Sequence, residues 1–208
     1  MLRRCIGAAA VAAALVASIA IASTPASAAK AVECDGTLSL GNAPKTRVIV
    51  EAGASCTVVD STIKSLRALP GSVDVFVVDS DVTRNLMVRG ATGTVHIGPA
   101  DCRFDPNVGN NVVVRNSHNV LICLMSVDNN ITVRNNDGRV TVRDSSAGNN
   151  IKVNRNLAYA PQAGDPTHVN AGAIRILRNT ADNHIVARGN DASRDVIARD
   201  NTPAAIIA

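Results

Sequence analysis

The sequence predicts an all-β fold in which short coils stack into a solenoid, and three observations support this prediction. One phrase recurs, in which an Asn is followed by alternating apolar residues. Its copies begin at Asn85, Asn111, Asn130 and Asn150, and a variant copy begins at His184. Successive copies lie 19–26 residues apart, or 34 apart where a segment is inserted. No amphipathic segment with a helical period follows residue 29. A fixed period of this size indicates stacked units, each unable to bury its apolar side alone.

Each phrase has the pattern of a half-buried strand. Ile131 and Val133 alternate with Thr132 and Arg134, which is a period of two with β-branched residues. A second series of short apolar segments lies between the phrases and predicts a second strand in each coil. Its members begin at Val95, Val120, Val140, Ile174 and Val196.

Polar residues follow these strands and predict tight corners. Asn, Asp and Gly tolerate a left-handed backbone, and Asn and Asp bond their own main chain, so they turn the chain without a long loop. The corner residues are Asn116, residues 135–138, Asp144, Asn156, Asn179, Asn190 and Asn201.

Two strands and a short third side, such as residues 125–127, fill a coil of about 20 residues. We therefore predict a right-handed parallel β-helix with coils of about 20 residues, in which each strand pairs with its equivalent one coil on. Its interior is a stack of Val, Ile, Leu and Ala. Equivalent residues lie on one another, so the repeated Asn should form a side-chain ladder.

The two ends of the chain have different compositions. Arg3 and Arg4 precede an apolar run over residues 6–22, and Ala26-Ser-Ala offers a small-residue cleavage site. This order is typical of a secretory signal peptide, predicted over residues 1–29. A transmembrane anchor is the alternative, but the flank after the run carries no stop-transfer charge. We predict a secreted, extracellular protein without stable membrane insertion, and a single β-helix domain over residues 30–208 with a loop insertion at 157–172.

The charge balance gives little support for nucleic-acid binding. The full chain has 21 basic and 17 acidic residues; without Arg3 and Arg4 the basic count is 19 and the net charge +2. With no Trp, one Tyr and two Phe, the chain also offers almost no surface on which bases could stack.

Four cysteines follow the predicted signal peptide, and an even number in an exported chain indicates disulfides. Spacing favours the pairs Cys34–Cys56 and Cys102–Cys123, which are 22 and 21 residues apart, or about one coil. Neighbouring coils lie about 4.8 Å apart, within the Cα separation that a disulfide accepts. A zinc site is the alternative, but the sequence has no C-x-x-C.

Three stretches carry a resemblance to known proteins: Gly-Thr-Val-His-Ile-Gly at 93–98, Asn-Val-Leu-Ile-Cys-Leu-Met-Ser-Val at 119–127, and the repeated Asn-Asn phrases. The chain resembles right-handed parallel β-helix proteins, the fold of pectate lyases and of many exported bacterial surface proteins. It looks similar to a group of uncharacterised secreted actinobacterial proteins of this kind. The resemblance covers roughly residues 34–201, implies the fold and is silent on activity. Bactofilins are similar in period only, and they are cytoplasmic.

A set of arginines shares one outward position at the ends of the strands. The functional interpretation is a basic stripe that binds anionic cell-wall or extracellular polysaccharide, because guanidinium groups match carboxylates and phosphates. The alternative is a solvated face whose charges are balanced by Asp137, Asp144, Asp195 and Asp200. The candidate residues are Arg89, Arg115, Arg134 and Arg188 in one series and Arg143 and Arg199 in the other.

The inserted segment 157–172 contains the only Tyr of the chain. Long loops on a rigid scaffold often carry binding residues, and Tyr159, Asp165 and His168 are the candidates here. A tolerated, neutral insertion is the alternative interpretation.

No catalytic residue, metal site or cofactor is predicted. Asp79 and Asp81 form the only close acid pair, and Asp is common in turns. The four His are scattered without ligand spacing. We expect a non-enzymatic extracellular structural or binding protein. A polysaccharide lyase or hydrolase on a pectate-lyase-like fold and a self-associating surface component are the alternatives.

Overall fold

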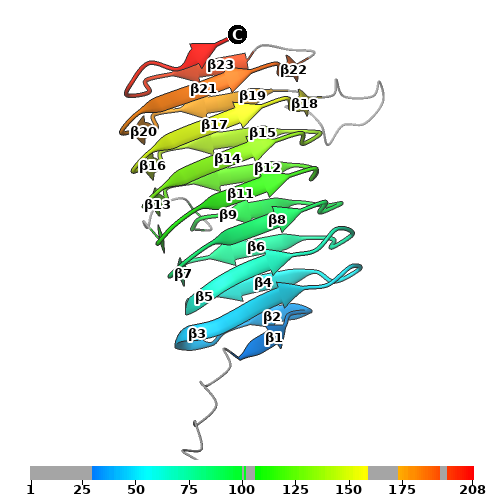
Figure 1. Cartoon of the computed structure of the whole chain (residues 1–208). Helices are drawn as coiled ribbons and strands as arrows, with labels where there is room; N and C mark the ends of the chain where they lie inside the picture. The colour runs from blue at the N-terminus through cyan, green and yellow to red at the C-terminus, as the bar shows by residue number, and fades with distance from the viewer. Residues whose placement is uncertain (1–29, 100, 102–105, 159–172, 193–195) are drawn as a thin grey trace, which may run out of the picture.

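The computed structural model describes residues 30–99, 101, 106–158, 173–192 and 196–208. Every regular element within these ranges is a β-strand, and no helix among them is long and apolar enough to cross a membrane. The strands stack along one axis, with β1 and β2 at one end and β23 and β24 at the other (Figure 1). The fold predicted from the sequence, an all-β solenoid with coils of about 20 residues, is therefore confirmed.

Sheet A has 14 strands and covers two sides of the solenoid. Its long side, at the front of Figure 1, consists of β1 (Ala31–Glu33), β3 (Gly41–Val50), β5 (Ser61–Ala68), β8 (Leu86–Arg89), β11 (Val112–Arg115), β14 (Asn130–Arg134), β17 (Asn150–Asn154), β21 (His184–Arg188) and β24 (Ile206–Ile207). Its short side consists of β7 (Asp81–Val82), β10 (Asn107–Val108), β13 (Ser126–Val127), β16 (Ser146–Ala147) and β20 (Thr180–Ala181).

Sheet B has eight strands and lies behind sheet A in Figure 1. It consists of β2 (Gly36–Leu38), β4 (Cys56–Val59), β6 (Val75–Val78), β9 (Val95–Ile97), β12 (Val120–Cys123), β15 (Val140–Arg143), β19 (Ile174–Leu177) and β23 (Val196–Arg199). A third, two-stranded sheet joins β18 (Leu157–Ala158) to β22 (Asp191–Ala192). The first two residues of the predicted insertion therefore belong to β18.

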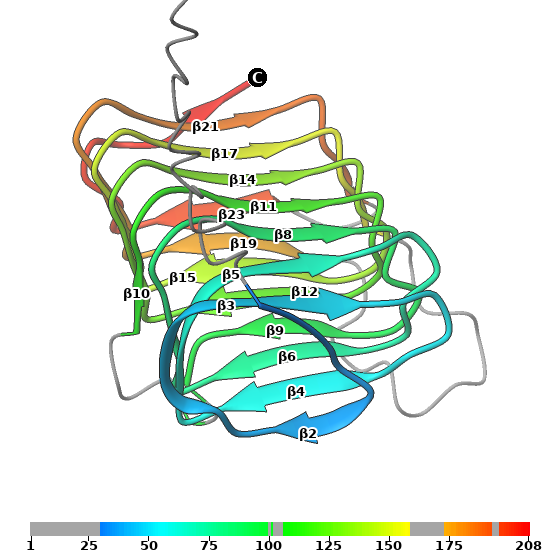
Figure 2. The same ribbon diagram turned by 60° about the horizontal axis from the view of Figure 1, so that its bottom comes forward.

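All strand pairs are parallel, and each strand pairs with its equivalent on the next coil. Val120 pairs with Val140, 20 residues on, whereas Val140 pairs with Ile174 across the insertion. The chain runs along β8, crosses to β9 and returns by the short side, and this winding is right-handed (Figures 1 and 2). Right-handed connection is the usual outcome for parallel strands, because each strand carries a right-handed twist.

The apolar positions of the repeat form one continuous core. Leu86, Val112, Ile131, Ile151 and Ile185 occupy one register column and are all fully buried. The residues between them along each strand point outward, as the alternation of period two predicts.

The corners of the coils combine a left-handed residue with a buried polar one. Asn116, Asn135 and Asp144 have φ of 52°, 53° and 53°. The residue that follows each of them points into the solenoid and bonds to a neighbouring coil. These buried polar residues include Ser117, Asn136, Ser145, Asn156 and Asn179.

Asn156 and Asn179 differ from the sequence interpretation, which made them turn residues bonding their own main chain. The left-handed residues are instead Arg155 and Arg178, one position earlier. Asn156 is fully buried and its Oδ1 accepts from the backbone N and from Nδ2 of Asn136, at 3.0 and 2.9 Å. These corners therefore hold adjacent coils together through internal amide ladders.

The predicted outer asparagine ladder is confirmed. Asn111, Asn130 and Asn150 each donate from Nδ2 to the Asn one coil before, starting at Asn85, over 3.1–3.2 Å. A parallel series runs beside it, in which Asn149 donates to the Oδ1 of Asn129 at 3.2 Å. The ladder marks the start of the long strands of sheet A.

Asn156→Ala is expected to lower the free energy of unfolding by about 2 kcal/mol, because it leaves the buried amide of Asn136 and the carbonyl of Val133 without partners. Asn130→Ala is the matched control, since it removes a rung of the half-exposed ladder that water can replace, at a cost below about 1 kcal/mol. Urea unfolding followed by circular dichroism measures both. Equal losses would contradict the difference between inner and outer ladders.

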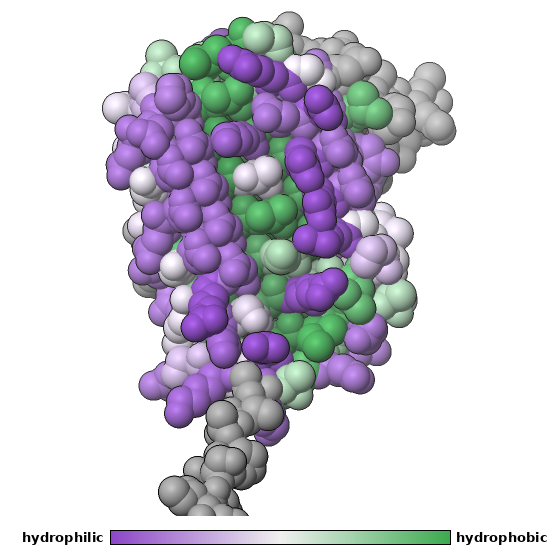
Figure 3. Space-filling view, in the orientation of Figure 1, coloured by the Kyte–Doolittle hydropathy of each residue, from purple (hydrophilic) through white to green (hydrophobic). Residues whose placement is uncertain are grey.

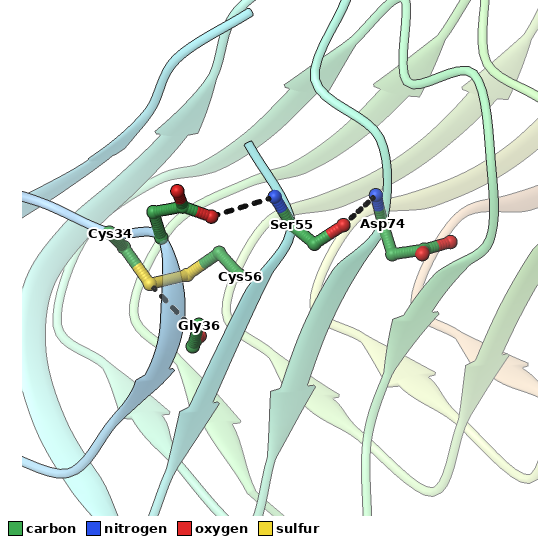
Figure 4. The surroundings of a disulfide bond; sticks show 6 residues. Cys34, Gly36, Ser55, Cys56 and Asp74 are labelled. Atoms are coloured by element: carbon green, nitrogen blue, oxygen red, sulfur yellow. Dashed lines mark hydrogen bonds between the residues drawn. A yellow bond between two sulfur atoms is a disulfide. The ribbon is translucent and has the colours of Figure 1, made fainter. Parts of the chain in front are cut away.

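The predicted disulfide between Cys34 and Cys56 is present. It joins two neighbouring coils at the N-terminal end of the solenoid, with the Cα atoms 5.5 Å apart (Figure 4). The backbone N of Ser55 donates to Asp35 Oδ1, and the backbone N of Asp74 donates to Ser55 Oγ, both over 3.4 Å. In the second predicted pair, Cys123 is fully buried, but Cys102 lies outside the described residues, so this pair remains a prediction.

Candidate functional site

Three of the predicted arginines form a column at the ends of β8, β11 and β14. Arg115 pairs in register with Arg89 on the coil before it and with Arg134 on the coil after it. Neighbouring strands in a sheet lie about 4.8 Å apart, so the three residues start one strand spacing from one another. Arg89 and Arg115 are half-buried and Arg134 is exposed.

The next coils continue the positive charge with one interruption. Asn154 takes the place of Arg on β17, and its Oδ1 accepts from the backbone N of Arg188 at 3.0 Å. The same strand carries Lys152, whose side chain is exposed and which pairs in register with Thr132 and Val186. We call the resulting series the cation track, one basic residue on each of five successive coils: Arg89, Arg115, Arg134, Lys152 and Arg188.

Lys152 was missed by the search for a repeated arginine position. Lys152 stands two residues earlier in the phrase, where the other copies carry Met87, Val113, Thr132 and Val186. A comparison of the net charge of each whole coil, in place of one phrase position, would have found it.

The cation track lacks the counter-charges expected for an ordinary solvated face. The strands β8, β11, β14, β17 and β21 contain no Asp or Glu. Within the described part of the chain, no guanidinium group of Arg89, Arg115 or Arg134 forms an ion pair. The Nε of Arg89 is also buried without a hydrogen-bond partner among these residues.

The acidic residues proposed as counter-charges lie elsewhere. Asp137 contacts His118, with Oδ1 3.0 Å from Nδ1, and Asp144 binds Arg178 on the sheet B side. Asp195 lies outside the described residues. Partial desolvation, and then the charges of its two neighbours in the column, lower the pKa of Arg115. The column is therefore a set of close like charges that an external anion would relieve.

The long side of sheet A gives the track a defined setting. The outer asparagine ladder starts each strand, the track ends it, and an apolar band including Met87, Val113 and Val186 runs between them. Figure 3 shows this band along the solenoid axis with hydrophilic side chains on both margins. The face offers amide groups, methyl groups and cations in parallel rows.

The second series of predicted arginines lies on sheet B. Arg143 and Arg199 occupy one register column, with Leu177 between them. Arg143 lines a cleft of about 630 Å³ on the outer face of sheet B, together with Arg139, Arg175 and Arg178. The sequence analysis did not group these three arginines with Arg143. The inserted segment separates Arg143 from Arg175 by 32 positions in the sequence, although β15 and β19 are paired.

The acidic residues considered for catalysis are also placed. Asp79 and Asp81 line a cleft of about 500 Å³ with Asp60 from the preceding coil. Asp81 Oδ1 accepts from the backbone N of Asn107 at 2.8 Å. Within the described ranges, no group of three or more His, Cys, Asp or Glu is arranged to hold a metal ion.

His96 is the histidine with a perturbed pKa, and its surroundings are those of a packed residue. Burial lowers the pKa of His96, a hydrogen bond from the backbone of Pro99 raises it, and the charge of Arg143 lowers it further. The ring packs edge-on against Phe76, with centroids 6.3 Å apart. No carboxylate contacts the ring among the described residues, so His96 lacks the partner expected of a general base.

The loop candidates Tyr159, Asp165 and His168 lie outside the described residues. Their predicted role in binding remains a prediction.

Comparison of the chain with protein-family models, with curated proteins and with solved structures finds no match in any of the three.

Proposed function

We propose that this protein is an exported, non-enzymatic β-solenoid that binds a linear anionic polysaccharide along sheet A. The observation that carries the proposal is the cation track, which places one uncompensated basic residue on each of five consecutive coils. A polymer with regularly spaced carboxylates or phosphates that lies along the solenoid axis would meet these cations in succession. Each contact is weak alone, and their linkage along one chain supplies the affinity.

The rest of the face supports a sugar polymer as the partner. The half-exposed amide rungs of the asparagine ladder can donate to and accept from hydroxyl groups. The apolar band accepts the C–H faces of sugar rings without aromatic residues. The near absence of aromatic side chains is a reason to prefer a polysaccharide to a single-stranded nucleic acid.

The resemblance to pectate-lyase-like proteins belongs to this proposal only as a fold on which acidic glycans can be held. The disulfide at the N-terminal end suits an oxidising, extracellular location, which is where such polymers occur. A lyase would also need a base beside a carboxylate cage, and His96 and the Asp60, Asp79 and Asp81 cleft do not supply that arrangement.

Retention on immobilised polygalacturonate tests the proposal. Arg115→Gln/Arg134→Gln should weaken binding at low salt about tenfold, because two exposed charge contacts together contribute roughly 1.4 kcal/mol. Binding of the unmodified protein should itself decrease as NaCl is raised, since exposed charges are screened over about 10 Å at 0.1 M salt.

The control variant is Arg139→Gln/Arg175→Gln, which removes the same charge from sheet B. It should elute with the unmodified protein. Equal losses in the two variants would show that net charge alone causes retention, and unsaturated products released from the polymer would move the protein to the lyase class.

A further inference from the structure

The cleft on sheet B contains more guanidinium groups than its carboxylate can neutralise. Four arginines line it, from β15, from β19 and from the residues next to these strands: Arg139, Arg143, Arg175 and Arg178. Asp144 is the one carboxylate that contacts them among the described residues.

Asp144 is largely committed to a single arginine. Its two oxygens accept from Nε and Nη2 of Arg178 at 2.6 and 2.8 Å, a paired geometry that fixes the guanidinium. The nearest nitrogen of Arg143 is 3.7 Å away. Hydrogen bonding to Asp144, and then its charge, raise the pKa of Arg178, and Asp200 on the next coil adds to this effect. Asp144 therefore positions Arg178 and leaves the other arginines available.

Arg175 is the residue most clearly left for a ligand. It stands on the outer face of β19, in register with Thr141, and its side chain is half-buried. Its Nε is buried and has no hydrogen-bond partner within the described ranges. A buried donor without a partner costs free energy that an incoming acceptor recovers. Arg139 is exposed, and its guanidinium forms no ion pair with any described residue.

The remaining lining suits an organic molecule better than a bare ion. Leu121 and Leu177 contribute apolar surface, and Thr94 and Asn119 contribute polar groups at the margin. The volume of about 630 Å³ is within the range of small-molecule sites, well above the size of one phosphate.

We propose that this cleft binds the phosphate ester of a small sugar, with the dianionic phosphate held between Arg139 and Arg175 and the sugar ring on Leu121 and Leu177. Arg143 and the fixed Arg178 add positive potential around the phosphate. Guanidinium groups match phosphate oxygens in paired geometry, and a dianion uses the surplus charge that one carboxylate would leave. The site is on the opposite side of the solenoid from the cation track and does not depend on it.

Calorimetric titration at low salt with glucose 6-phosphate tests the proposal. We expect one molecule bound per chain, weaker binding of inorganic phosphate, which lacks the ring, and no heat with glucose. Arg139→Gln/Arg175→Gln should weaken binding of the ester at least about tenfold, since it removes both partners of the phosphate. Arg139→Gln alone should also weaken it, and this exposed side chain has no structural bond to lose.

Arg115→Gln/Arg134→Gln should bind the ester as the unmodified protein does, so the failure of either proposal leaves the other testable. Three results would overturn the cleft: no heat at about 10 mM ester, an affinity unchanged in the Arg139 and Arg175 variants, or equal affinities for the ester and inorganic phosphate. A shift of the Nε–H resonance of Arg175 on addition of the ester, absent with glucose, would support the assignment of the orphan donor.

Discussion

A Val133→Asp substitution is expected to abolish the native fold. Val133 is fully buried and lies in register between Val114 and Val153, which are also fully buried. A carboxylate there has no water and no cationic partner, so it is buried as a charge or protonated at a strongly raised pKa. Either state costs several kcal/mol, comparable with the whole stability of a typical domain, about 5–15 kcal/mol.

Thr132→Asp is the matched control, one residue away on the outer face of β14. Thr132 is half-exposed and pairs in register with Lys152, so the new carboxylate would gain a cation beside it. Circular dichroism and urea unfolding should show a native, cooperative transition for Thr132→Asp and none for Val133→Asp. Similar transitions in both variants would mean that the inward and outward positions of the strand are exchanged.

The strands were predictable because their signal is local and repeated. The alternation around Ile131 and Val133 fixes which residues enter the core, and the recurrence of the phrase fixes which strands pair. The outer ladder follows from the same argument, because Asn111 and Asn130 occupy one position of the phrase and must stack.

The corners were predicted less completely. A run such as Asn135-Asn136 shows that the chain turns, but it does not show which residue takes the left-handed conformation. That choice decides which side chain enters the solenoid. At Arg155-Asn156 the left-handed residue is the arginine, with φ of 54°. This assignment opposes the usual preference for Asn at such positions, and the buried bonds of Asn156 to Asn136 and Val133 favour it.

The two basic surfaces show the same limit. Arg89, Arg115 and Arg134 recur at one phrase position, so the sequence identifies their column. The cleft joins Arg175 to residues that are close only because an insertion separates two paired strands, β15 and β19. Adjacency of this kind depends on the register across the insertion. The pairing of Asp137 with His118, in place of an arginine, likewise depends on how two neighbouring corners lie.

Removal of the Cys34–Cys56 disulfide is expected to give the second large effect. The bond closes a segment of 22 residues, and both cysteines are buried in the first coils. A closed loop of this length stabilises a fold by about 3 kcal/mol, mainly because it restricts the unfolded chain. Cys34→Ala/Cys56→Ala should therefore lower the free energy of unfolding by about 3 kcal/mol and the Tm by roughly 6–12 °C.

The loss should be concentrated at one end of the solenoid. Each coil contacts mainly its neighbours, so β1 and β2, which lie at the terminal edge, depend on the bond more than β11, β14 and β17 do. Hydrogen exchange in the double variant should accelerate in β1 to β4 and stay nearly unchanged in β11 to β17. Peptide mapping without reductant gives an independent check, since a Cys56–Cys102 peptide would contradict the register of the first coils. A uniform rise in exchange along all coils would instead mean that the solenoid unfolds as one cooperative unit, with the first coil contributing to the stability of the last.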